Sequence, residues 1–296
     1  MAADGRTPRT IRERAPAKVN LFLHLTGRRT DGYHLLDGLV AFTRFGDRIA
    51  VRLADRLSLS VGGPFAEAVP PGDGNLALSA ATALRARMLG APGAAIRLEK
   101  RVPVAAGLGG GSSDAAAVLR ALARLWRAPA ALDLEEIARG LGADVPMCLA
   151  GGPARIAGVG DRLTPCPAFP ALPILLVNPR RPLATPDVFR ARTGAWREPL
   201  PALPTAAPEP LLRALAETGN DLADAAATLA PEVGAVLAAL SYLPGCRLAR
   251  MSGSGATCFA IFDQGTALSR AAGRLRRRHP GWWIRPTVLE GLRAPR

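Results

Sequence analysis

The sequence predicts a mixed α+β protein of two domains, and three observations support this. Residues 18–25 alternate apolar and polar side chains with the period of two that a strand requires. Residues 95–125 run in the order strand, glycine-rich loop, helix. A proline-dense stretch at 164–210 indicates a domain boundary, and the strands and helix that follow over 246–288 suit a small open-faced α+β domain. A chain of 296 residues has room for two domains of ordinary size.

The amino-terminal strand is expected to present two different faces. One face holds the apolar side chains of Val19, Leu21, Leu23 and Leu25. The other holds Lys18, Asn20, Phe22 and His24. A lysine beside an asparagine suits a strand face turned toward phosphate, and the alternative is a face exposed to solvent. Ahead of this strand, residues 1–10 predict a disordered tail, and the polar, arginine-rich start lacks the apolar core of a secretory signal.

The other elements follow from local signals. Asp31-Gly32 predicts a turn. Asn75 predicts the N-cap of a helix over 76–89, and a second helix is expected over 132–139. Further strands are expected at 10–14, 39–43, 47–53, 57–61, 95–99, 172–177, 246–251, 258–262 and 282–288, with a hairpin over 151–163. Further helices are expected at 115–125, 211–217, 222–229, 231–240 and 266–277, with a second glycine-rich turn at 252–257.

The charge is strongly positive. The formal net charge is +14, and nearly every basic residue is arginine because lysine occurs only at Lys18 and Lys100. One explanation is compositional bias of the genome, and the other is attraction of anionic substrates such as nucleotides. Nucleic acid is a further candidate partner, but no basic stripe interleaved with aromatic residues supports it. The two lysines stand out because lysine is a compact, tunable point charge and arginine is not.

The cysteines and the hydropathy indicate the cellular compartment in which the protein is expected. The four cysteines, Cys148, Cys166, Cys246 and Cys258, show no metal-type spacing. Free thiols in a reducing cytoplasm are therefore expected. No apolar run is long enough to span a bilayer, so no membrane partner is expected.

The most informative stretch is rich in glycine. It comprises Pro103, Val104, Ala105, Ala106, Gly107, Leu108, Gly109, Gly110, Gly111, Ser112 and Ser113. Glycines let the backbone approach a ligand closely, and a helix start offers unpaired N–H groups to an anion. The stretch therefore predicts a phosphate cradle. It lacks the lysine of a P-loop and the last glycine of the dinucleotide fingerprint, and the alternative is a plain turn capped by Ser112.

Three separated segments, 16–23, 103–113 and 251–256, resemble the motifs of the superfamily of galactokinase, homoserine kinase, mevalonate kinase and phosphomevalonate kinase, the GHMP kinases. Two more, at 31–34 and 142–146, are similar to the branch of that superfamily that phosphorylates a cytidine-diphosphate-linked methylerythritol. The resemblance runs from about residue 14 to about residue 290, and the proline-rich residues 194–210 match nothing in it.

The resemblance implies a two-domain GHMP kinase fold with the site between the domains. The ATP domain, ribosomal-protein-S5-like, would cover 11–165, and a ferredoxin-like domain would cover 166–296, with 194–210 as a linker or insert. ATP and Mg²⁺ would be the cofactors. The γ-phosphoryl group would move to the 2-hydroxyl of the methylerythritol moiety, without nucleic-acid or membrane partners, in a monomer or weak homodimer.

The catalytic pair implied by the resemblance is Lys18 and Asp144. Pro146 disfavours helix at Val145, so Asp144 is expected in a fixed bend, where an aspartate often only caps. The family match makes it the general base for the attacking hydroxyl. Lys18 would hold Asp144 ionised and stabilise charge that builds on the transferred phosphoryl group.

The remaining site residues are assigned by the same resemblance. The loop 103–113 would wrap the ATP phosphates, and Ser112 or Ser113 is a candidate ligand of Mg²⁺. Asn20 would donate to a phosphate, Tyr33 would stack on the cytosine, and His34 would bond the base edge. Further substrate contacts would come from Phe189, as a second stacking ring, and from Gly253, Ser254 and Gly255. Asp114 is interpreted as a helix N-terminal acid.

Three other functions stay open. The first is another GHMP kinase, of homoserine or mevalonate type, which has no obvious use for Tyr33 and His34. If these two residues have no role in binding, the simplest explanation is that Tyr33 is a half-buried ring and His34 an imidazole with its hydrogen bonds satisfied. A nucleotide-binding module without catalysis has no use for a lysine–aspartate pair. A nucleic-acid binder would show steeply salt-dependent binding to duplexes.

Overall fold

The computed structural model describes residues 9–290, and they form two compact units. Unit 1 comprises the chain as far as Ala15, together with Gly46–Val104 and Gly110–Leu149. Unit 2 comprises Pro16–Phe45, Ala105–Gly109 and the chain from Ala150 onward. Two of the boundaries fall inside the two longest strands, β1 (Ile11–Arg28) and β2 (His34–Ala54). Of the tail predicted at 1–10, all but residues 9 and 10 lie outside the described residues.

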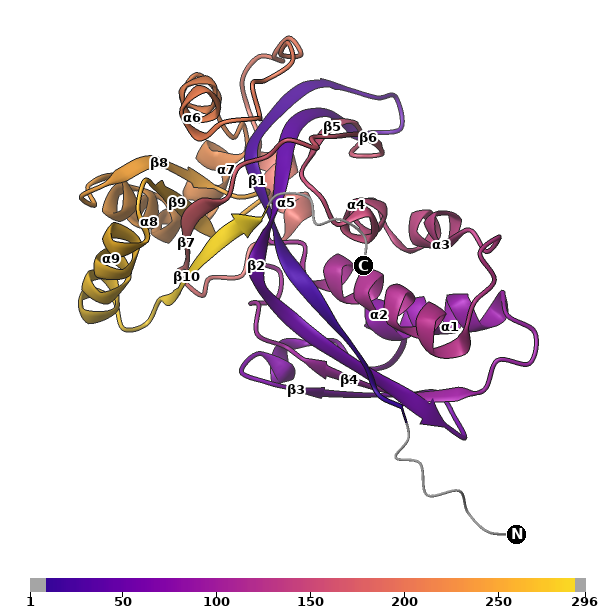
Figure 1. Cartoon of the computed structure of the whole chain (residues 1–296). Coiled ribbons are helices and arrows are strands. Elements are labelled where there is room, and N and C mark those ends of the chain that lie inside the picture. Colours follow the sequence, from indigo (N-terminus) through magenta and orange to yellow (C-terminus); the bar gives the residue numbers. More distant parts are fainter. Residues whose placement is uncertain (1–8, 291–296) are drawn as a thin grey trace. The chain divides into compact units, whose positions relative to one another are not determined.

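In unit 1 helices pack beside a short sheet. Strand β4 (Gly93–Glu99) pairs antiparallel with the second half of β2 and parallel with β3 (Ser58–Gly62). Two 3₁₀ turns, Ala66–Ala68 and Gly72–Gly74, lead to α1 (Leu76–Ala86), which packs along α2 (Gly110–Trp126) (Figure 1). Helices α3 (Leu134–Leu141) and α4 (Val145–Ala150) follow. The buried face of α2 consists largely of alanine and leucine, which lets helices approach closely where aromatic residues are few.

In unit 2 the sheet is antiparallel. The order is β2, β10 (Trp283–Glu290), β7 (Leu172–Asn178), β9 (Cys258–Phe262) and β8 (Cys246–Met251). Strand β5 (Ala154–Gly158) pairs with β2 and with β6 (Arg162–Pro165). The helices of this unit are α5 (Thr185–Ala191), α6 (Pro208–Ala216), α7 (Ala223–Leu229), α8 (Pro231–Ser241) and α9 (Gly265–Arg278). Because β7 lies between two strands, its apolar run is buried almost throughout.

Most predicted elements are confirmed, with some mergers. The strands expected at 10–14 and 18–25 are one strand, β1, and those at 39–43 and 47–53 are one strand, β2. Asn75 caps α1, accepting from the N–H of Ala77 at 2.9 Å. The helix expected from residue 115 begins at Gly110, so the last glycines of the loop are already helical.

The structure excludes one alternative, corrects one expectation and adds one helix. The face of β1 that carries Lys18, Asn20 and His24 is not exposed to solvent, because all three side chains are buried. Helix α4 begins at Val145 although Pro146 follows, since a proline in the first turn removes an N–H that needs no partner there. Helix α5 was not predicted, although its first turn also accepts a proline.

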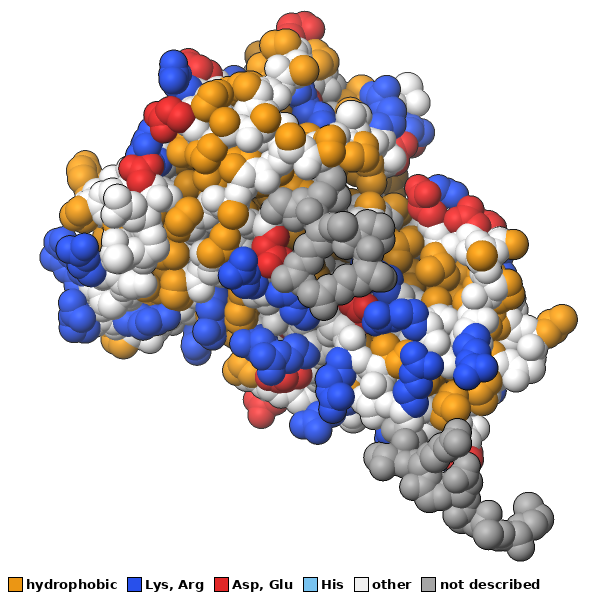
Figure 2. Space-filling view, viewed as in Figure 1, with side chains coloured by type: hydrophobic (Ala, Val, Ile, Leu, Met, Phe, Trp, Pro, Cys, Tyr) orange, Lys and Arg blue, Asp and Glu red, His pale blue; other side chains and the backbone are white. Residues whose placement is uncertain are grey.

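The charge is dispersed on one face of the molecule. On the face shown in Figure 2, lysine and arginine side chains are spread among apolar, neutral and acidic ones. Among the helices of residues 9–290, none is long and apolar enough to cross a membrane.

Candidate active site

In unit 2, β1 and the two glycine-rich segments converge. The backbone N–H of Lys18 donates to the carbonyl of Leu108 at 2.9 Å. The N–H of Asn20 donates to Ser252 Oγ at 3.1 Å, and that hydroxyl donates to the carbonyl of Gly107 at 2.9 Å. The strand that bears Lys18 and Asn20 is therefore tied to both loops, through Ser252, which the sequence reasoning did not single out.

The two loops approach so closely that only glycine fits at Gly107. Its φ is 72°, in the left-handed region. A Cβ atom there would lie 2.3 Å from the carbonyl oxygen of Ser252 and 2.8 Å from that of Gly255. Among the glycines of the first loop, Gly107 thus allows close packing of backbone against backbone.

Asn20 offers an unsatisfied polar atom at this place. Its side chain is 3% exposed, and its Oδ1 has no hydrogen-bond partner among the described residues. A Cβ atom at Gly253 would lie 3.4 Å from that oxygen, so it faces the second loop. Buried acceptors without a partner are rare and call for a donor. A bound ligand could supply this donor. Asn20 would then accept a hydrogen bond through its amide oxygen, in addition to donating to a phosphate as predicted.

The second glycine-rich loop is held from behind by Asn220. Its Nδ2 donates to the carbonyls of Met251 and Gly253, each at 2.8 Å, and its Oδ1 accepts from the N–H of Leu222 at 3.0 Å. Asn220 is nearly buried, so these bonds are shielded from water. Its only signal in the sequence was its place after Gly219, where a helix was expected to end.

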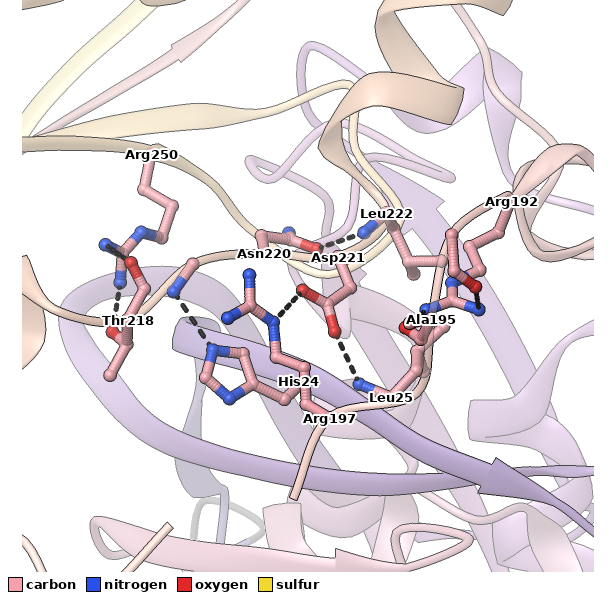
Figure 3. Close-up of polar contacts among 12 residues, drawn as sticks. His24, Leu25, Arg192, Ala195, Arg197, Thr218, Asn220, Asp221, Leu222 and Arg250 are labelled. Carbon is pink, nitrogen blue, oxygen red and sulfur yellow. Dashed lines mark hydrogen bonds and ion pairs between the residues drawn. The ribbon is translucent and has the colours of Figure 1, made fainter. Parts of the chain in front are cut away.

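The segment that contains Asn220 docks along β1 (Figure 3). The N–H of Gly219 donates to His24 Nε2 at 3.1 Å, and the N–H of Leu25 donates to Asp221 Oδ2 at 2.9 Å. The buried Arg250 donates to the carbonyl of Leu21 at 2.7 Å. Burial lowers the pKa of His24, which keeps the imidazole neutral and able to accept. The strand and both loops therefore belong to one hydrogen-bonded framework.

The predicted base-binding residues gather around His34. The ring of Phe189 lies 5.0 Å from that of His34, and Tyr33 is 66% exposed and free to meet a ligand. Helix α5, which carries Phe189, is joined to the second loop by a 2.8 Å hydrogen bond between Thr185 Oγ1 and Ser254 Oγ. Burial also lowers the pKa of His34, so its ring is neutral at pH 7 and offers one donor and one acceptor.

Asp144 lies in unit 1, in the turn before α4, as the expected bend requires. It is half-buried, and its carbonyl accepts from the N–H of Cys148 at 3.1 Å. Arg120 of α2 donates to the carbonyl of Cys148 at 2.9 Å and to that of Leu149 at 3.3 Å. A half-buried guanidinium therefore holds the far end of α4, and this fixes the short helix that directly follows Asp144.

A buried ion-pair cluster lies at the start of α2. Lys100 Nζ is 2.6 Å from Asp47 Oδ2 and 2.6 Å from Asp114 Oδ2, with all three side chains almost fully buried. Asp47 Oδ1 also accepts from the N–H of Val102 at 2.8 Å. A Cβ at Gly110 would lie 3.0 Å from Lys100 Nζ. Asp114 is thus more than the helix N-terminal acid expected from the sequence: with Lys100 it fixes the first turn of α2.

This cluster yields a pH-dependent prediction. Burial, with the nearby Asp47 carboxylate, raises the pKa of Asp114 to about 8, although Lys100 acts the other way. A carboxyl whose folded pKa exceeds its unfolded value stabilises the fold at low pH, and that stability is lost as pH rises toward 8. Asp114→Asn is expected to raise the thermal unfolding midpoint relative to wild type at pH 9, with a smaller difference at pH 6. An equal difference at both pH values would contradict it, and exposed Asp224→Asn serves as control.

The residues predicted to contact ATP phosphates and Mg²⁺ include two serines at the start of α2. The first turn of α2 contains the buried Ser113 and the half-buried Ser112. Within residues 9–290, no cluster of three or more His, Cys, Asp or Glu side chains could hold a metal ion. This donor set fits Mg²⁺ held mainly by nucleotide phosphates and water, with at most a hydroxyl from the protein.

The predicted site residues thus fall into two groups. Unit 2 contains the larger group, and the contacts above bring several of its members together. This group consists of Lys18, Asn20, residues 105–109, the base-binding residues Tyr33, His34 and Phe189, and residues 253–255. Residues 103–104, 110–113 and Asp144 lie in unit 1. The pairing of Lys18 with Asp144 therefore stays a prediction.

Comparison with known proteins identifies the class. The GHMP kinases N terminal domain profile matches residues 75–152, and the GHMP kinases C terminal profile matches residues 200–281. The chain resembles a solved homoserine kinase from Cytophaga hutchinsonii in fold, with a TM-score of 0.70 at 18% identity over 98% of both chains. The fold is that of a GHMP small-molecule kinase.

Closer relatives narrow the class. The 4-diphosphocytidyl-2-C-methyl-D-erythritol kinase of Paramagnetospirillum magneticum is 52% identical over 93% of this chain and 97% of its own length. That of Mesorhizobium japonicum is 50% identical over 92% and 94%. A crystal structure of 4-(cytidine 5'-diphospho)-2C-methyl-D-erythritol kinase is 40% identical, with a TM-score of 0.78, over 95% of this chain and all of that one. The chain belongs to the 4-diphosphocytidyl-2-C-methyl-D-erythritol kinase family.

Proposed function

We infer that the protein transfers the γ-phosphoryl group of ATP to the 2-hydroxyl of 4-diphosphocytidyl-2-C-methyl-D-erythritol, a step of non-mevalonate isoprenoid biosynthesis. The observation that carries this inference is the identity of about half of all positions to kinases of that name over nearly the whole chain. The aromatic residues around His34 support it, because a flat nucleobase is a ligand that such rings bind well.

In the proposed mechanism, positioning and charge neutralisation do most of the work. The backbone of 103–113 wraps the ATP phosphates, and the start of α2 at Gly110 adds the partial positive charge of a helix N-terminus. Asp144 accepts the proton of the attacking 2-hydroxyl as the new phosphate ester forms and ADP leaves. Lys18 stabilises the charge on the phosphoryl group as it passes between the two oxygens.

Substrate recognition is assigned to unit 2. Tyr33 and Phe189 stack on the cytosine, and His34 uses its one donor and one acceptor at the base edge. Asn20 contacts a phosphate or hydroxyl of the substrate, and residues 253–255 line the substrate side. Mg²⁺ bound to the phosphates would neutralise their charge, with Ser112 or Ser113 as a candidate protein ligand.

We also propose that the enzyme works in the cytoplasm. All four cysteines are free thiols, which suits a reducing compartment. No separate nucleic-acid function is needed to explain the charge, because both substrates are polyanions.

The function is tested with purified protein, Mg²⁺ and ATP. ADP release is expected with 4-diphosphocytidyl-2-C-methyl-D-erythritol, together with a new phosphomonoester signal in the ³¹P NMR spectrum of the product. Homoserine and mevalonate are expected to give little or no turnover. If homoserine or mevalonate is turned over with a higher kcat/KM than 4-diphosphocytidyl-2-C-methyl-D-erythritol, the chain is assigned to that other kinase activity instead.

A further inference from the structure

We propose that the segment 192–201 of the proline-rich region holds His34 in its base-reading orientation through Trp196, which makes Trp196 a positioning residue for the cytidylyl substrate. This inference rests on the proposed function. It gives a task to residues that lie outside the family motifs.

Trp196 contacts the residue that is assigned to the base edge. The Trp196 and His34 ring centroids lie 5.8 Å apart with the planes tilted by 57°, and Phe189 lies 5.0 Å from the same imidazole. His34 is therefore in contact with two rings from different segments. Trp196 itself is 47% exposed, so burial in a core does not account for its place.

The turn that presents Trp196 is shaped by Arg192. Its guanidinium lies 4.4 Å from the centre of the Trp196 ring and donates to the carbonyl of Gly194 at 2.7 Å and to that of Ala195. Gly194 has a φ of 100°, which favours glycine at this point of the turn. Figure 3 shows Arg192 curled back over Ala195. The indole is thus held by its own segment, and a bound substrate is not needed to order it.

One anchor fastens this segment to β1. The N–H of Arg197 donates to the carbonyl of Leu25 at 2.9 Å, and its Nε donates to Asp221 Oδ1 at 2.7 Å (Figure 3). The other oxygen of Asp221 accepts from the N–H of Leu25. The residue after Trp196 is therefore locked to the strand that precedes the Tyr33–His34 turn.

A second anchor fastens it to β2 and β5. Arg155 forms a two-pronged pair with the buried Asp37, at 2.6 and 2.7 Å. Asp37 Oδ2 also accepts from the N–H of Leu200 at 2.8 Å, while Arg155 donates to the carbonyls of Leu200 and Pro201, each at 2.8 Å. Such fork-shaped, charge-assisted bonds fix direction as well as position. Asp37 lies three residues after His34, so one anchor serves both the strand and the segment.

The consequence is pre-organisation. An imidazole free to change rotamer loses that freedom when a base binds, and the loss weakens binding. Because the ring of His34 contacts both Phe189 and Trp196, it is ordered beforehand. The effect concerns the cytidylyl substrate and leaves the ATP phosphates untouched.

The test compares Trp196→Ala with Trp196→Phe in steady-state kinetics. Trp196→Ala is expected to raise KM for the cytidylyl alcohol about 3- to 10-fold, the worth of one aromatic contact, with KM for ATP and kcat unchanged. Trp196→Phe is expected to recover most of the loss. Trp282→Ala, which removes an indole stacked on His279 at 3.8 Å, is the matched control and is expected to leave both KM values unchanged.

Two further readouts separate positioning from general structure. In a double-mutant cycle, His34→Ala with Trp196→Ala is expected to cost no more than His34→Ala alone, because Trp196 acts through that ring. Burial, with Arg28 and Arg192 nearby, lowers the pKa of His34, so in Trp196→Ala the NMR titration of His34 is expected to move up toward its ordinary value. Additive losses in the cycle, or an unmoved His34 titration, would contradict the proposal.

The outcomes also separate this inference from the proposed function. A wild-type enzyme that turns over the cytidylyl alcohol while Trp196→Ala keeps the same KM overturns the inference alone. A wild-type enzyme without that activity overturns the proposed function.

Should Trp196→Ala fold poorly, Arg192→Ala is the second variant. It loosens the same turn without removing a ring from His34, and it is expected to raise KM for the cytidylyl alcohol by a smaller factor.

Discussion

Asp144→Asn is expected to lower kcat by at least about a hundredfold, with the Kd for ATP close to that of the wild type. Asparagine has nearly the same shape as aspartate but cannot take a proton from the attacking hydroxyl. The backbone of the turn should hold, because the carbonyl of residue 144 still accepts from Cys148 and Arg120 still holds the end of α4. The loss should therefore lie in the chemical step.

The measurement is single-turnover phosphorylation at saturating substrates, with ATP affinity from calorimetric titration. Asp224→Asn is the matched control, because Asp224 is exposed in the first turn of α7 and distant in sequence from every motif. An undiminished rate in Asp144→Asn would remove Asp144 from the mechanism. A large loss of ATP affinity would instead assign it a binding role.

Gly107→Ala is expected to have the second large effect, on both stability and ATP binding. The added methyl group would lie 2.3 Å from the carbonyl oxygen of Ser252, and the φ of 72° is itself unfavourable for alanine by about 1–2 kcal/mol. Backbone of both loops must move to relieve the collision. A loss of at least about 2 kcal/mol in the free energy of unfolding is expected, with KM for ATP raised more than tenfold, since the loop that moves is assigned to its phosphates.

Denaturant titration and initial rates measure these two effects. The control is Gly234→Ala, the fourth residue of α8, where an added Cβ meets no atom within 4 Å. There alanine is expected to stabilise the protein by roughly 0.5–1 kcal/mol without changing KM, because it removes the flexibility of a helical glycine. If Gly107→Ala behaves like Gly234→Ala, the two loops do not need their close approach.

The sequence was a good guide where local signals and packing agree. The N-cap at Asn75, the buried strand at 172–177 and the last strand–helix–strand run are found as predicted, since each has a marked periodicity or capping residue. It was a poor guide to α5 and to the start of α4. The proline-dense stretch around α5 predicts a domain boundary, and Pro146 disfavours helix at Val145, although the first turn of a helix accepts proline.

The site could be predicted only in part for a similar reason. The glycine-rich loop and Lys18 belong to motifs that are contiguous in sequence. Asn220, Ser252 and Lys100 act through partners far along the chain, and no local pattern reports such pairs. Lys100 did stand out as one of only two lysines, but the carboxylates that surround it come from β2 and α2 and became visible only in three dimensions.

The chain passes from one unit to the other five times, after Ala15, Phe45, Val104, Gly109 and Leu149. Two of these crossings lie within the single loop 103–113. Neither half is an uninterrupted piece of polypeptide. A split-gene version cut once near the middle would deliver two incomplete bodies, because residues 16–45 and 105–109 of unit 2 lie in the first half of the chain.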